Sequence, residues 1–98
     1  MPQSVILFWR DIPTQVIAKA GRVAAKRQLS ARFLEAVDAA AMRAGAKSAD
    51  DYLADWRRGP PEPCGEDLEA EAQRLAALLE SEFDSARLGD LVRREGRA

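Results

Sequence analysis

Histidine is absent from this 98-residue sequence, and Cys64 is its single cysteine. The lack of histidine removes the most common general base and the most common metal ligand in proteins. One cysteine cannot form an internal disulfide, and without histidine it cannot build a zinc or iron–sulfur site within one chain. We therefore expect no metal, no cofactor, no catalytic residues and no independent enzymatic activity.

Long apolar segments are also missing. The apolar run at residues 5–9 is short, whereas a secretory signal needs about 7–15 apolar residues and a membrane span about 20. Apolar residues make up 47% of the sequence and charged residues 32%, a composition typical of globular proteins. We expect one domain, residues 1–98, in a cytoplasmic protein that makes no membrane contact.

Three N-terminal segments have the character of strands. Residues 4–10 are β-branched and aromatic, and residues 15–20 and 23–29 alternate between two faces, with Gly21 marking a turn between them. Proline cannot donate a hydrogen bond to a strand ladder, so we predict that Pro13 lies in the turn after the first strand.

The hydrophobic period changes to a helical one at Ser30. The spacing predicts a helix from Ser30 to Gly45, followed by a short helix that begins at Ser48 with Asp51 in capping-box spacing. The segment 57–65 is rich in proline and glycine, which favours an extended or looped structure. Two further helices are predicted, one from about residue 66 and one from about residue 85, and residues 96–98 are expected to fray.

This order of elements predicts an α+β fold. We expect a two- or three-stranded N-terminal antiparallel β-meander packed by three to four C-terminal helices. Its core should combine the strand at residues 5–9 with two helical stripes, Phe33/Val37 and Leu75/Leu79/Phe83.

A basic segment is the candidate working surface. Lys19, Arg22, Lys26 and Arg27 lie within nine residues, and Arg10 ends the first strand. If residues 15–29 form a hairpin, these side chains gather near Gly21, where they could bind an acidic protein or an anionic small ligand. The alternative is that they protect an edge strand from aggregation. A pI of about 5.5, and no aromatic residues among these bases, argue against nucleic acid as a partner.

Three other kinds of side chain have a reactive or a packing interpretation. Trp9 and Trp56 could stack on a ligand ring, but each lies in an apolar pattern that favours the core. Cys64 precedes a helix, and the acids that follow it disfavour a thiolate, so we interpret it as a small packed residue. The carboxylates from Glu62 onward could form an acid/base or cation site, but we interpret them as the solvated face of a helix.

The sequence resembles the bacterial "virulence factor" domain family, and W-R-D-I-P followed by Q-V-I is its most specific motif. The likeness is carried by residues 8–13, 15–17, 19–22, 25–26, 32–33, 40–45 and 52–56. The family includes small stand-alone proteins and a segment of conserved virulence factor C. The resemblance implies no assigned reaction and no catalytic residues. Its stand-alone members accompany genes for tetrahydrofolate-linked methyl transfer, which implies an accessory role in one-carbon metabolism.

Two functions remain open from the sequence. The first is a non-catalytic accessory or regulatory module that binds another protein through the basic segment. The alternative is an accessory subunit that binds a small anion or cofactor and is linked to tetrahydrofolate-dependent one-carbon metabolism.

Overall fold

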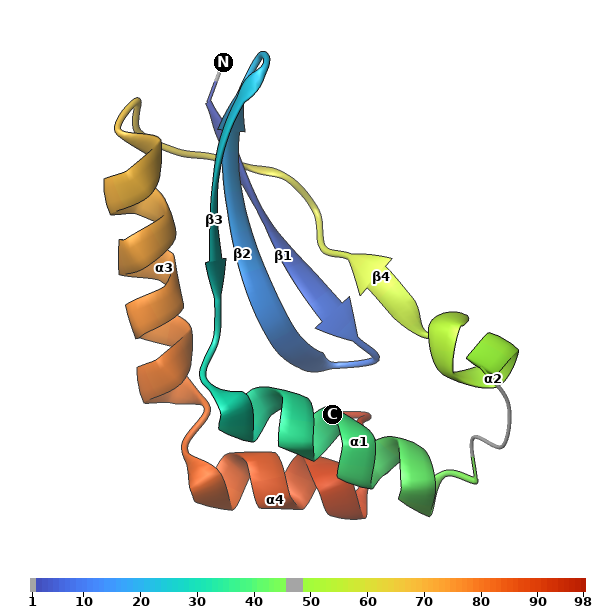
Figure 1. Ribbon diagram of the computed structural model, residues 1–98. Coiled ribbons are helices and arrows are strands. Elements are labelled where there is room, and N and C mark those ends of the chain that lie inside the picture. The colour runs from blue at the N-terminus through green and yellow to red at the C-terminus, as the bar shows by residue number, and fades with distance from the viewer. Residues whose placement is uncertain (1, 46–48) are drawn as a thin grey trace.

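Three N-terminal strands form an antiparallel meander, as the alternating sequence predicts. They are β1 (Gln3–Trp9), β2 (Ile12–Ala20) and β3 (Val23–Gln28). In the computed structural model, which describes residues 2–45 and 49–98, β2 pairs with both β1 and β3 (Figure 1). Gly21 makes the β2–β3 turn at φ +58°, a left-handed conformation that glycine adopts at little steric cost.

Two short strands extend the sheet beyond the meander. β4 (Trp56–Arg58) and β5 (Glu62–Pro63) both pair with β1, so the sheet has the order β3-β2-β1-β4 with β5 also on β1. We predicted that this segment is extended or looped. The prolines of this segment make a strand hard to predict from the sequence. In the structure they lie at the ends and edge of the sheet, where the missing N–H of proline is tolerated.

Pro13 lies inside β2, so its predicted place in the turn was wrong. The turn is formed by Arg10 and Asp11, and the β1–β2 register shifts between Leu7 and Phe8, where Pro13 pairs with Phe8. The hydroxyl of Thr14, the residue skipped by this shift, donates to the Leu7 carbonyl at 2.9 Å. Such a bulge interrupts the ladder locally, which allows a proline within the strand.

Within residues 2–45 and 49–98, four helices complete the fold and confirm the α+β prediction. They are α1 (Ala31–Arg43), α2 (Ala49–Leu53), α3 (Leu68–Glu82) and α4 (Ser85–Arg93). The side chains of Asp67 and Asp84 cap α3 and α4 by accepting hydrogen bonds from Ala70 and Arg87 N–H groups. The predicted capping role of Ser48 lies outside the described residues. Within the described ranges, no helix has the length and apolar character needed to cross a membrane.

The helices meet the sheet in two places. α3 lies along one face of the meander, and α1 and α4 lie side by side across one end of it (Figure 1). Val16, Ala18 and Ala25 of the sheet share a buried cluster with α3 and α1 residues, including Leu79 and Phe33. The predicted core is therefore confirmed at both helical stripes. Leu75 is the exception, because it is half-buried and borders a cleft.

Glu80 joins α3 to the start of α1. Its carboxylate accepts hydrogen bonds from the Ser30 N–H at 2.6 Å and the Ser30 hydroxyl at 2.9 Å, and from Arg32 at 3.0 Å. Burial alone would raise the pKa of the Glu80 carboxyl, but these hydrogen bonds outweigh it and hold the pKa below its usual value. The Ser30 hydroxyl consequently donates to Glu80 and forms no N-cap hydrogen bond with α1.

The C-terminal tail is anchored, so the expectation that residues 96–98 fray was wrong. The Asp11 N–H donates to the Gly96 carbonyl at 2.8 Å, and the Ala98 N–H donates to the Asp11 carboxylate at 2.7 Å. Gly96 has φ +84°, and a Cβ added there would lie 2.9 Å from the Trp9 ring. A glycine at this position lets the tail pass directly over Trp9.

Candidate functional site

Three of the five predicted basic residues gather around the β2–β3 turn, and we call Lys19, Arg22 and Lys26 the basic tip. The turn lies at the end of the meander away from α1 and α4 (Figure 1). Lys26 is opposite Ile17, and Ile17 shares a face of β2 with Lys19, so both lysines project from the sheet face that points away from α3. All three side chains are exposed.

The charges of the basic tip have no ion-pair partner among the described residues. No ion pair between described residues involves Lys19, Arg22 or Lys26. The ion pairs use other cations, namely Arg10, Arg27, Arg32, Arg57, Arg74, Arg93 and Arg94. The basic tip is thus a local excess of positive charge in a chain whose net charge is −1.

Arg10 is not part of this group. It lies in the β1–β2 turn, at the other end of β2, and a nine-residue strand spans roughly 27 Å. Its side chain is 13% exposed, pairs with Asp55 at 3.1 Å and donates to the Glu95 carbonyl at 2.7 Å. These contacts join the turn to the α2–β4 connection and the C-terminal tail, which is a structural role.

Arg27 lies close to the basic tip in sequence but on the other face of the sheet. It pairs with Val16 in the β2–β3 register, and Val16 belongs to the core cluster shared with α3. The Arg27 guanidinium contacts the Glu69 carboxylate of α3 at 3.7 Å. This residue therefore links β3 to α3 and is not part of the basic tip.

Both tryptophans and the cysteine pack within the fold, which is the interpretation that the sequence favours for each of them. Trp9 is fully buried, and its indole N–H donates to the Tyr52 carbonyl at 2.9 Å. Trp56 is half-buried and meets the Tyr52 ring edge-on at 5.9 Å. Cys64 is a half-buried free thiol in contact with the core.

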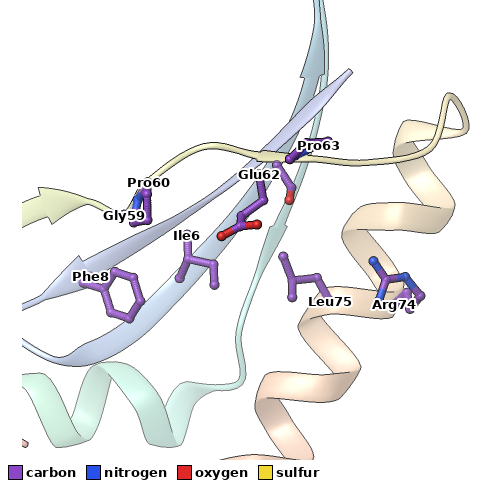
Figure 2. A pocket seen from close by; sticks show the side chains of 9 residues that line it. Ile6, Phe8, Gly59, Pro60, Glu62, Pro63, Arg74 and Leu75 are labelled. Atoms are coloured by element: carbon purple, nitrogen blue, oxygen red, sulfur yellow. The ribbon is translucent and has the colours of Figure 1, made fainter. Parts of the chain in front are cut away.

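A cleft of about 470 Å³ opens between β1 and α3 (Figure 2). Ile6 and Phe8 of β1 and Leu75 of α3 form its apolar surface. The segment that connects β4 to β5 bounds another side, where the Gly59 N–H donates to the Ile6 carbonyl at 2.8 Å. A Cβ at Gly59 would lie 2.9 Å from the Phe8 ring, so this wall approaches closely because residue 59 is a glycine.

Charged side chains stand at the border of the cleft. Arg74 is held by Glu71 through two hydrogen bonds, at 3.0 Å and 2.8 Å. The Arg74 guanidinium, together with the Gly65 N–H, holds the pKa of the Glu71 carboxyl below its usual value. Glu62, which we interpreted as part of a solvated helix face, instead belongs to β5 and lines the cleft.

Comparison with known proteins gives one match. A family model described as "Virulence factor" matches residues 7–92, from β1 to α4. The chain belongs to the virulence factor family. No curated protein and no solved structure matches it. The resemblance found in the sequence is confirmed, and the matched region includes the whole basic tip.

The side chains of the basic tip are suited to binding an anion. Exposed lysine and arginine side chains form charge-assisted hydrogen bonds to carboxylates and phosphates. Within residues 2–45 and 49–98, no three His, Cys, Asp or Glu side chains lie close enough together to hold a metal ion. The basic tip is therefore suited to an anionic surface or group.

Proposed function

We propose that this domain is a non-catalytic accessory module that binds an acidic surface of another protein through the basic tip. The observation that carries the proposal is that Lys19, Arg22 and Lys26 gather around one turn and that none of them forms an ion pair with a described residue. Complementary charge across an interface speeds encounter and selects the partner. Three exposed cations at one end of the domain supply that complementarity.

Protection of a sheet edge explains this arrangement less well. β3 is an edge strand, and Lys26 is the kind of residue that discourages pairing with another chain. Lys19 does not fit that role, because it lies on β2, which is paired on both sides. Arg22 lies in the turn between the strands. A binding role accounts for all three positions together.

The proposal predicts the behaviour of the double variant Arg22→Ala, Lys26→Ala. Each lost charge-assisted hydrogen bond costs about 1.5–3 kcal/mol in a desolvated contact, so binding of the partner should weaken by about tenfold or more. Exposed substitutions usually change stability by less than about 0.5 kcal/mol, so the variant should fold normally. We would identify the partner by affinity purification and mass spectrometry, then measure its dissociation constant with both proteins purified.

A matched control removes two cations elsewhere. Arg93→Ala, Arg94→Ala changes the net charge equally at the end of α4, and it should bind the partner as the wild type does. Raising salt above 0.1 M shortens the Debye length below about 10 Å, which should weaken the wild-type complex and scarcely affect the tip variant. Equal affinity of both double variants at every salt concentration would exclude the basic tip as the binding surface. Competition by millimolar inorganic phosphate would instead favour an anionic small ligand.

A further inference from the structure

We infer that the cleft between β1 and α3 binds a small organic cation, meaning a molecule with an apolar body and one ammonium or guanidinium group. This site is separate from the basic tip, and the inference does not depend on the proposed protein partner. Its volume of about 470 Å³ falls within the range of clefts that hold small molecules, about 300–1,000 Å³.

The apolar surface of the cleft comes from two elements. Ile6 and Phe8 contribute from β1, and Leu75 contributes from α3 (Figure 2). All three are half-buried, and Ile6 and Leu75 pack against the buried core cluster. An apolar ligand body of modest size would cover the surface that these side chains leave open to water.

Ser4 supplies an available hydrogen-bonding group. The residue is 8% exposed and lines the cleft, yet its hydroxyl forms no hydrogen bond with any described residue. Among the described residues, no side-chain polar atom is both fully buried and without a partner, so the Ser4 hydroxyl is accessible to solvent and free to hydrogen-bond with a group that enters the cleft. Ser4 is also the register partner of Glu62, which places the hydroxyl and the carboxylate on adjacent strands of the same face.

The charge around the cleft selects a cation. The Glu62 carboxylate points toward Ile6 and Leu75 (Figure 2), and it forms no ion pair with a described residue. The two guanidinium groups near the cleft are already paired with acids. Arg74 binds Glu71 at 2.8 Å. Arg57 lies over the Phe8 ring and binds Asp11 at 3.0 Å. One carboxylate charge is thus left without a counter-ion at the apolar surface.

The prolines beside the cleft disfavour an added peptide strand. Pro60, Pro61 and Pro63 have no backbone N–H, so the segment from β4 to β5 offers few donors to a strand that would extend the sheet there. Main-chain hydrogen bonds supply the affinity of strand addition. A compact ligand that enters the cleft needs none of these donors.

The test uses two aromatic probes of similar size and opposite charge, 2-phenylethylammonium and 3-phenylpropanoate. Each is titrated into the ¹⁵N-labelled full chain while amide chemical shifts are followed. The ammonium probe should shift the amides of Ile6 and Gly59 and saturate with a dissociation constant on the order of 1–10 mM, as expected of a fragment-sized ligand. The carboxylate probe should not saturate.

Two isosteric variants isolate the contribution of the charge. Glu62→Gln should raise the dissociation constant of the ammonium probe by about tenfold, whereas Glu66→Gln, an equal charge change outside the cleft, should leave it unchanged. Both residues are exposed, and the spectra themselves report folding. Equal binding of the two probes, a change of less than about twofold in Glu62→Gln, or shifts confined to other amides would overturn the inference.

Discussion

Replacing Trp9 by alanine should lower the free energy of unfolding by about 3–5 kcal/mol, a large fraction of the roughly 5–15 kcal/mol that holds a domain together. Trp9 has no exposed surface, and its ring stacks on Tyr52 with centroids 5.9 Å apart. Its indole N–H also satisfies the Tyr52 carbonyl, so the substitution leaves both a cavity and an unpaired acceptor. Urea unfolding followed by circular dichroism measures the effect.

Trp56→Ala is the matched control for this prediction. It removes the same side chain from the neighbouring register position on β4, where the residue is half-buried. We expect less than about half the loss of stability, because a half-exposed side chain contributes less buried apolar area. If the two variants are equally stable, Trp9 is not the centre of the core that the structure describes.

Gly96→Ala should cost about 2–4 kcal/mol although it adds a single methyl group. The residue combines a left-handed backbone conformation with close contact, since a Cβ would lie 2.9 Å from the Trp9 ring. Gly45→Ala separates the two causes, because Gly45 has φ +75° but no atom within 4 Å of an added Cβ. That control should lose about 1 kcal/mol from conformational strain alone.

Thermal melts of the two glycine variants, at one protein concentration and pH, compare them directly. A similar small loss in both would mean that the tail does not hold Gly96 against Trp9. A markedly larger loss in Gly96→Ala supports the anchored tail, in which Asp11 binds both Gly96 and Ala98.

Local patterns were sufficient to predict the meander and the helices. Alternating residues define β2 and β3, Gly21 defines their turn, and the acids at Asp67 and Asp84 mark helix starts. The errors concern features that depend on distant contacts. The bulge that accommodates Pro13 depends on the β1–β2 register. The short strands β4 and β5 form because they pair with β1, which is distant in the sequence.

The candidate sites, too, could be predicted only where they depend on neighbouring residues in the sequence. The basic segment was visible in the sequence, but Arg10 lies at the other end of β2 and Arg27 on the other sheet face. There they pair with Asp55 and Glu69, which are far along the chain. The cleft could not be predicted from the sequence, because β1, the β4–β5 segment and α3 come together only in the fold. Nothing in the sequence distinguishes Glu62 from the many other acids of the C-terminal half.

Site-specific photo-crosslinking tests most directly whether the basic tip contacts an acidic partner protein. A photoreactive amino acid at Ala24, the register partner of Lys19, is compared with the same amino acid at Ala86, an exposed position on α4. Our account predicts a partner crosslink from position 24 that disappears when salt is raised, and none from position 86. Crosslinks from position 86 alone, or crosslinks from position 24 that persist at high salt, would contradict it.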